Sequence, residues 1–208
     1  MINIGINGFG RIGKSILHQS IKNQNIRVTS INFPDFKIDK IISYIQNDSF
    51  HKYDKLDVDV VNEKTIKVNN NIIRVLNKRT PEKDMWCGAK YVFETTGKFL
   101  TNEKAKEHDA EYFIMCAPAK DNTPQYLFNG NHLTYKGEKI ISNSSCTTNC
   151  IVPLIKLLND KYGIEHANFI TVHAATASQN VLDGVHLKNR SHRSIFNNII
   201  PHTTGASK

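Results

Sequence analysis

One glycine-rich segment near the start of the sequence constrains the fold of this chain more than any other feature. Gly8, Gly10 and Gly13 have the spacing G-x-G-x-x-G. The apolar run Ile2–Asn7 before them predicts a strand, and the amphipathic stretch Arg11–Lys22 after them predicts a helix. A dinucleotide site requires this context: the first glycine permits a tight turn, the second lets the backbone approach a pyrophosphate, and the third lets the helix pack on the strand. A glycine-rich turn without a ligand is the alternative interpretation.

The remainder of the first 148 residues repeats the alternation of strand and helix patterns. Short apolar runs predict strands, and the amphipathic stretches between them predict helices. The further expected strands are 27–31, 71–76, 91–94, 112–116 and 139–142, and the further expected helices are 38–46 and 102–108. Because strands and helices alternate at this spacing, the fold class is α/β, with a Rossmann-type parallel sheet domain over residues 1–148.

A second domain is expected to begin at residue 149 and to continue to residue 208. The long stretch Cys146–Tyr162 predicts a helix at the junction. Its buried apolar stripe is expected to comprise Ile151, Leu154, Ile155, Leu157 and Leu158. Residues 168–173 predict a strand, and a long polar loop over 174–199 follows. This unit is therefore the first part of an α+β domain.

Composition and charge narrow the classes of protein to which the chain can belong. Hydrophobic residues make up 39% of the chain and charged residues 22%, which is typical of a globular protein. The net charge of +8 favours anionic partners, but the lysines are spread along the chain, so we do not expect nucleic acid as a partner. The four cysteines form no C-x-x-C pair, which indicates a reduced cytoplasmic protein without a metal site. No apolar run approaches the ~20 residues of a membrane span, so we expect no membrane association.

The end of the second expected strand leaves the choice of nucleotide open. A dinucleotide site of this type places an acidic residue there, where it binds the adenosine ribose. The sequence has Phe33 at this position, and Asp35 lies two residues further on. Asp35 either binds the ribose or is a plain loop residue, so NAD is the expected cofactor and NADP is not excluded.

A cysteine at the start of the long helix is the candidate nucleophile. Cys146 follows two serines at the point where a strand gives way to a helix. A helix N-terminus stabilises a thiolate through its dipole and its free N–H groups. His173, at the end of the next expected strand, could act as the base. Cys150, four residues after Cys146, is interpreted as a packed small hydrophobe.

Taken together, these residues resemble the phosphorylating glyceraldehyde-3-phosphate dehydrogenase family. The resemblance covers the whole chain in order, and the block Ser-Cys-Thr-Thr-Asn-Cys is highly specific to this family. The matching segments are residues 4–13, 142–150, 171–174 and 198–201, with weaker agreement at 94–97 and 117–118. The resemblance implies a cytoplasmic, homotetrameric oxidoreductase of glycolysis.

The family's chemistry implies roles for the two candidate catalytic residues. Cys146 would attack the aldehyde of glyceraldehyde 3-phosphate, and His173 would accept the hydroxyl proton. Hydride would pass to the nicotinamide, leaving a thioester. Inorganic phosphate would cleave the thioester to 1,3-bisphosphoglycerate.

The resemblance also implies the binding residues, position by position. Besides the three glycines and Asp35, Arg11 and Ile12 would meet the cofactor pyrophosphate through their N–H groups, and Thr96 would line the cofactor cleft. The attacking phosphate would be bound by Ser145, Thr147, Thr204 and Gly205. Thr176 would contact the substrate's own phosphate. The loop 174–199 matches a segment that packs between subunits in the family, with Arg190 and Arg193 at its basic positions.

Three departures from the family's pattern leave alternatives open. Phe33 replaces the ribose-binding aspartate, residues 189–193 differ from the usual loop sequence, and the chain ends at Lys208 while family members continue beyond this point. The resemblance therefore implies a C-terminally truncated member. The alternatives are a non-catalytic dinucleotide-binding module or remnant subunit, and an erythrose-4-phosphate dehydrogenase.

Overall fold

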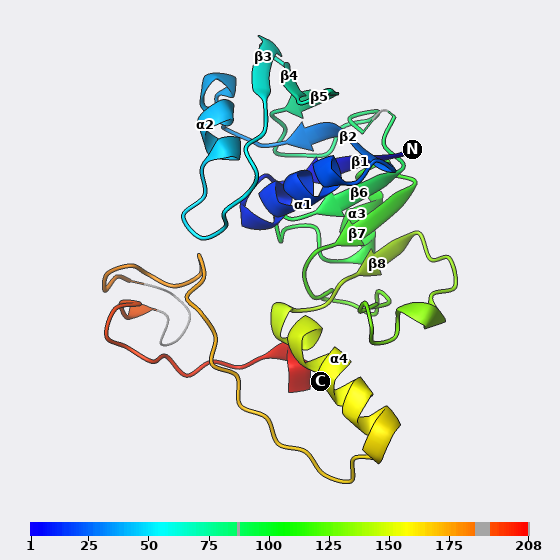
Figure 1. The fold of residues 1–208 in the computed structure, drawn as a ribbon, viewed down its shortest axis with the longest axis vertical. Helices are drawn as coiled ribbons and strands as arrows, with labels where there is room; N and C mark the ends of the chain where they lie inside the picture. Colours follow the sequence, from blue (N-terminus) through cyan, green and yellow to red (C-terminus); the bar gives the residue numbers. More distant parts are fainter. Residues whose placement is uncertain (87, 186–191, 208) are drawn as a thin grey trace.

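The computed structural model describes residues 1–86, 88–185 and 192–207, and an eight-stranded sheet organises its first two thirds (Figure 1). The strands lie in the order β3-β4-β5-β2-β1-β6-β7-β8. Their bounds are β1 Ile2–Asn7, β2 Ile26–Asn32, β3 Val58–Asn62, β4 Thr65–Val68, β5 Asn71–Leu76, β6 Tyr91–Glu94, β7 Tyr112–Met115 and β8 Ile140–Ser142. The pairs from β5 to β8 are all parallel, and this confirms the predicted α/β class.

The helices follow the strands as crossover connections require. Their bounds are α1 Arg11–Lys22, α2 Ile41–Gln46, α3 Asn102–Lys106 and α4 Cys146–Tyr162, with short 3-10 turns η1 Ile38–Lys40, η2 His132–Thr134 and η4 Gly205–Ser207. The helix α1 begins directly after the glycine motif and connects the parallel neighbours β1 and β2. Its bounds and those of α4 agree with the sequence prediction, whereas α3 ends two residues earlier than predicted.

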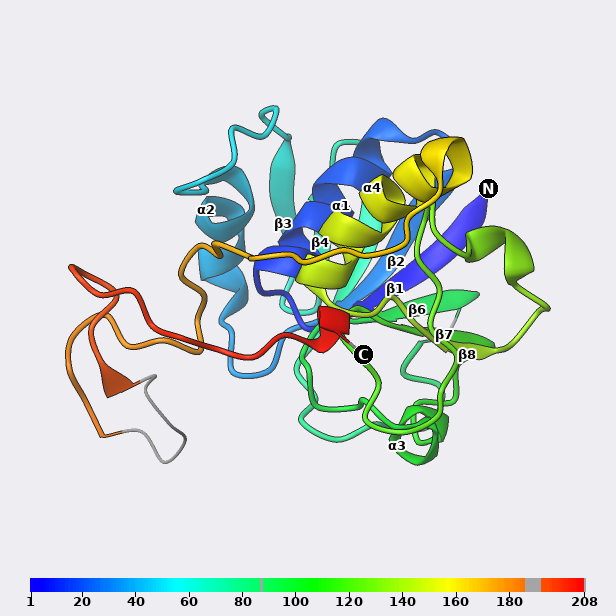
Figure 2. The same ribbon diagram turned by 90° about the horizontal axis from the view of Figure 1, so that it is seen from below.

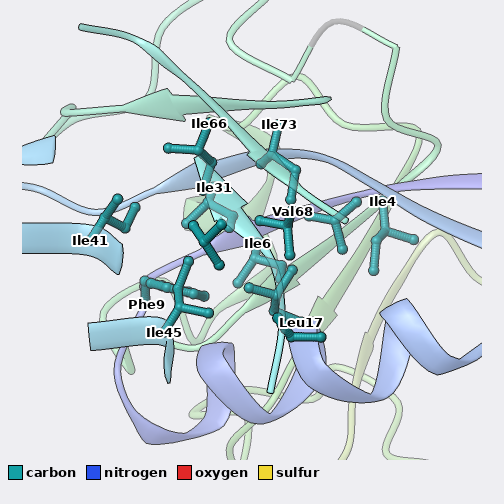
Figure 3. Close-up of a cluster of buried hydrophobic side chains, with 13 residues drawn as sticks. Ile4, Ile6, Phe9, Leu17, Ile31, Ile41, Ile45, Ile66, Val68 and Ile73 are labelled. Atoms are coloured by element: carbon teal, nitrogen blue, oxygen red, sulfur yellow. The ribbon is translucent and has the colours of Figure 1, made fainter. Parts of the chain in front are cut away.

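Apolar side chains between the sheet and helices α1 and α2 form the main core (Figure 3). Ile6 and Ile31 from adjacent strands and Leu17 from α1 are fully buried. A second cluster, which includes Val92 and Phe113, lies around β6 and β7. The two clusters hold the parallel strands in place, so the carboxyl ends of these strands lie together along one side of the sheet.

The antiparallel hairpin β3–β4 was not predicted from the sequence. Within the sheet, β4 pairs with β3 on one side and with β5 on the other, so β3 is the edge strand. Four of the five residues of β3 are exposed, and its polar and charged residues weaken the apolar pattern by which strands are recognised.

Two predictions for residues 149–208 are wrong. Residues 168–173 form no strand, because within the described part of the chain no segment pairs with them. The stripe on α4 is not buried: Leu154 and Leu157 are 58% and 63% exposed. The described chain directly after α4 runs on without forming a strand (Figure 2). The division into domains at residue 148 stays a prediction. No helix among the described residues is long and apolar enough to cross a membrane.

Candidate functional site

The turn after β1 is shaped by contacts that exclude a side chain at Gly8. Gly8 has a positive φ of 90°, and its N–H donates to the carbonyl oxygen of Asn32, 2.9 Å away. A Cβ at Gly8 would lie 2.7 Å from Cγ2 of Thr96. Thr96 therefore borders the glycine turn at the edge where the parallel strands end.

The start of α1 presents an open surface that fits a pyrophosphate. Gly10 is the N-cap and, because it has no side chain, makes no capping bond to the first N–H groups of α1. A Cβ at Gly10 would meet nothing within 4 Å, whereas a Cβ at Gly13 would overlap the carbonyl oxygen of Gly8. The two next residues leave the site accessible: Arg11 lies over the Phe50 ring at 4.5 Å, and Ile12 is 53% exposed. An anion at this helix N-terminus would meet free donors in a space that a side chain at position 10 would fill.

A buried carboxylate supports this edge, and the sequence analysis did not identify it. Glu94, at the end of β6, accepts hydrogen bonds from Asn7 Nδ2 at 2.5 Å and from the N–H groups of Thr96 and Gly97 at 2.7 and 3.0 Å. Burial raises the pKa of Glu94, while these hydrogen bonds oppose the rise. Its position as the last residue of a strand, directly before Thr-Thr-Gly, is the signal that could have identified it.

The end of β2 holds an aromatic cluster in place of the expected carboxylate. The Phe33 ring stacks on Phe36 with centroids 4.4 Å apart and contacts Phe9 and Tyr44. Asp35 is exposed, has a positive φ of 63° and forms an ion pair with Arg79. The structure thus places a carboxylate near the expected position, two residues further along and already paired.

Cys146 lies at the first position of α4, which begins four residues after β8 ends. The Ser145 Oγ accepts a hydrogen bond from the N–H of Thr148 at 3.0 Å and so caps the helix. Asn143, next to β8, donates its N–H to the carbonyl oxygen of Met115. The sheet therefore positions the exposed thiol of Cys146 at the same edge as the glycine turn.

His173 meets the Cys146 thiol across a short distance. The Cys146 Sγ and His173 Nε2 atoms are 3.1 Å apart, and His173 Nδ1 is 2.7 Å from the carbonyl oxygen of Ala174. A carbonyl oxygen only accepts, so Nδ1 carries a proton and Nε2 is the atom that faces the sulfur. Through this geometry the backbone of Ala174 determines which imidazole nitrogen acts as the base.

The pKa values of the two groups move toward each other. The hydrogen bond with His173 is the largest cause that holds the pKa of Cys146 below its ordinary value. The hydrogen bond to Ala174, followed by that to Cys146, raises the pKa of His173. Both shifts favour a thiolate beside an imidazolium, which is the reactive form of a nucleophilic cysteine.

The pair lines a pocket of about 450 Å³ between α4 and the extended segment 169–174. Thr147 and Cys150 also line it, together with apolar residues of both segments. Ser145 directly precedes Cys146, which lines the pocket. The turn η4 contains Gly205 and lies against α4 (Figure 1). Thr204 directly precedes η4. Thr176 is exposed and its Oγ1 is 2.9 Å from the hydroxyl of Ser178.

Two further sequence expectations concern the basic loop and metals. Arg193 pairs with Asp183 at 2.8 Å, whereas Arg190 lies outside the described residues. Across the described residues no group of three or more His, Cys, Asp or Glu side chains could hold a metal ion.

Comparison with known proteins identifies the family. Residues 2–102 match the model of the glyceraldehyde 3-phosphate dehydrogenase NAD binding domain, and residues 145–208 match that of its C-terminal domain. Glyceraldehyde-3-phosphate dehydrogenase of Bacteroides fragilis is 43% identical, and the cytosolic enzymes of Leishmania mexicana and Taxus baccata are 42% and 39% identical. Each alignment covers 100% of this chain and 63–64% of the relative, so the chain spans less than two thirds of the length of these curated relatives. Both domain models and all three relatives agree, and the chain belongs to the glyceraldehyde-3-phosphate dehydrogenase family.

Proposed function

We propose that this chain carries out the NAD-dependent oxidation and phosphorylation of glyceraldehyde 3-phosphate to 1,3-bisphosphoglycerate. The observation that carries the proposal is the 3.1 Å contact between Cys146 Sγ and His173 Nε2 at the sheet edge that also holds the glycine turn. The names of the relatives support the substrate, and the match to the NAD binding domain supports the cofactor.

The chemistry follows from the protonation states of the pair. His173 Nε2 takes the thiol proton, and the Cys146 thiolate adds to the aldehyde carbon. The imidazolium returns its Nε2 proton to the former carbonyl oxygen, which gives a thiohemiacetal and a neutral imidazole. The same imidazole then accepts the hydroxyl proton as the carbon–hydrogen bond breaks. Bound NAD supplies the hydride acceptor for this oxidation. Inorganic phosphate attacks the resulting thioester, the carbon–sulfur bond breaks, and Cys146 leaves as a thiolate while the acyl phosphate is released.

We assign the remaining contacts by the positions that match the family. The cofactor is bound by Gly8, Gly10, Arg11, Ile12, Gly13, Asp35 and Thr96, and the attacking phosphate by Ser145, Thr147, Thr204 and Gly205. Thr176 contacts the phosphate of the substrate. Residues 1–148 form the cofactor domain, and residues 149–208 belong to the catalytic domain. The cytosolic relatives favour a cytoplasmic location, and the family favours a homotetramer.

The test is reduction of NAD by the purified chain with glyceraldehyde 3-phosphate, with and without inorganic phosphate. The proposal expects phosphate-dependent turnover that Cys146→Ser abolishes and Cys150→Ser retains. Cys150 is the matched control, because it is exposed, one turn further along α4 and part of the same pocket. Binding of NAD without turnover would refute catalysis and favour a dinucleotide-binding module. A faster reaction with erythrose 4-phosphate in direct competition would refute the substrate assignment.

A further inference from the structure

The turn that leads from β8 into α4 contains a residue in a strained backbone conformation. Ser144 has a positive φ of 58°, which is the left-handed region that residues other than glycine rarely adopt. Such a conformation persists only where the surrounding contacts hold it, and these conformations cluster at functional sites. Cys146 lies two residues further along, so a rotation at Ser144 would move its thiol relative to the sheet.

The sheet holds this turn from one side. Ser142, the last residue of β8, is fully buried, and its Oγ accepts a hydrogen bond from the N–H of Ser144 at 3.1 Å. The same hydroxyl donates to the carbonyl oxygen of Ala117 at 2.7 Å. The start of the turn is therefore fixed to the neighbouring segment after β7.

A single side chain of α4 holds the turn from the other side. Asn149 Nδ2 donates to the carbonyl oxygen of Asn143 at 2.6 Å and to that of Ser145 at 2.9 Å. The backbone N–H of Asn149 donates to the same Ser145 carbonyl at 2.9 Å. Carbonyl oxygens only accept, so the amide must turn its NH₂ group toward both of them. This one amide thus ties together the residues on either side of Ser144.

The helix itself gives no reason for an asparagine at this position. Asn149 is the fourth residue of α4, where asparagine is a poorer helix former than alanine. Its side chain turns back to backbone carbonyl groups, a habit that competes with helix formation. Residues that break a local preference in this way are expected at functional sites. The choice of residue is therefore explained by the turn and not by the helix.

We propose that Asn149 is a positioning residue, whose side-chain amide holds the strained turn at Ser144 and so keeps Cys146 Sγ within reach of His173 Nε2. Without the amide, Ser144 relaxes from its left-handed conformation and the first residue of α4 moves away from the imidazole. The 3.1 Å contact between the two groups then lengthens. This inference rests on the proposed function for its catalytic meaning, but the position of the thiol can be measured without turnover.

Alkylation of the full chain by iodoacetamide, followed across pH by mass spectrometry, tests the inference. Asn149→Ala is expected to slow alkylation of Cys146 near pH 7 by at least about threefold, because less of the thiol is ionised when the imidazole is further away. The midpoint of the pH profile should move to higher pH. The circular dichroism should stay native because alanine favours the helix, and the Kd for NAD should change by less than about threefold.

A matched control and a rescue separate positioning from a general effect on α4. Asn159→Ala makes the same substitution further along the helix, where the Asn159 side chain accepts from the N–H of Ile164 at 3.3 Å. It should leave the alkylation rate and its pH profile unchanged. Ser144→Gly removes the strain, because glycine adopts a positive φ without steric cost. Added to Asn149→Ala, it should restore the rate to within about twofold of that of the unaltered chain.

Three results would overturn the inference. They are an unchanged alkylation rate in Asn149→Ala, a slow rate that Ser144→Gly does not restore, and a loss of the native circular dichroism in Asn149→Ala. The last would show that the residue is needed for folding and not for the position of the thiol. If Asn149→Ala slows alkylation but the unaltered chain shows no phosphate-dependent turnover, the proposed function fails while this inference stands.

Discussion

Replacing Gly13 or Gly10 by alanine should separate the packing role of the glycine motif from its proposed binding role. A Cβ at Gly13 would overlap the backbone carbonyl of Gly8 and lie 3.1 Å from both Ile6 Cγ2 and Thr95 Oγ1. The carbonyl cannot rotate away, so α1 must shift, at a cost of about 3 kcal/mol for overpacking. Alanine returns about 1 kcal/mol through its helix propensity. Gly13→Ala should therefore lose about 2 kcal/mol, or about 4–8 °C in Tm for a chain of this size.

Gly10→Ala should leave stability nearly unchanged but weaken the binding of NAD. A Cβ there meets nothing within 4 Å, and the backbone conformation (φ −78°, ψ −155°) is open to alanine. The weaker N-cap and the reduced entropy of the unfolded chain nearly cancel, so the change in stability should stay within about 0.5 kcal/mol. NAD affinity should fall by at least about tenfold, because the methyl group occupies the surface that the pyrophosphate approaches.

Thermal unfolding followed by circular dichroism, together with NAD titration of each variant, gives both quantities. The packing argument is refuted if Gly13→Ala unfolds at the same temperature as the unaltered chain. The binding argument is refuted if Gly10→Ala binds NAD as tightly as the unaltered chain does.

Three further predictions concern charged groups. His173→Asn should slow alkylation of Cys146 by iodoacetamide near pH 7 several-fold, because the pKa of the thiol then returns toward its ordinary value; an unchanged rate in mass-spectrometric labelling would contradict the coupling. Burial lowers the pKa of His108 to about 4, so protonation favours the unfolded chain. The free energy of unfolding should therefore fall by about 3 kcal/mol as the pH falls from about 6.5 to 4. Urea unfolding of His108→Gln should show a smaller decrease over the same pH range. The hydrogen bond from Lys14 holds the pKa of Asp48 far below its usual range, so this carboxylate contributes stability that is lost as the pH falls below about 4. Asp48→Asn should lower the free energy of unfolding by about 3 kcal/mol at pH 7, because it leaves Lys14 without its buried partner. A urea unfolding midpoint equal to that of the unaltered chain would count against a stabilising ion pair between these two residues.

The parts of the fold that could be predicted are those with a local signal. The strand, turn and helix around the glycine motif depend on patterns within about 20 neighbouring residues. The helix that begins at Cys146 was predicted with its observed bounds for the same reason. Residues 168–173 show the limit, because a strand pattern forms a strand only where another segment pairs with it, and pairing is not a local property.

The candidate site was predictable in its residue types but not in its connections. Cys146 and His173 could be proposed as a pair, yet their distance depends on how the segment after α4 returns along it. The ion pair of Asp35 with Arg79 joins residues 44 positions apart, and no pattern in the sequence relates them. Glu94 was missed for a related reason, since its hydrogen bond from Asn7 depends on the side-by-side pairing of β1 and β6.

Cys146 and His173 differ in what holds them in place, and this has a consequence for how reactivity is lost. Cys146 is fixed to the central sheet through β8, whereas nearly all described residues from 163 to 185, which carry His173, are exposed. A segment with so little buried surface opens locally at a small fraction of the free energy that global unfolding requires. Mild denaturant should therefore reduce the nucleophilicity of the thiol while the circular dichroism of the sheet is still native. The rate of alkylation of Cys146 would then measure the fraction of molecules in which His173 contacts the thiol.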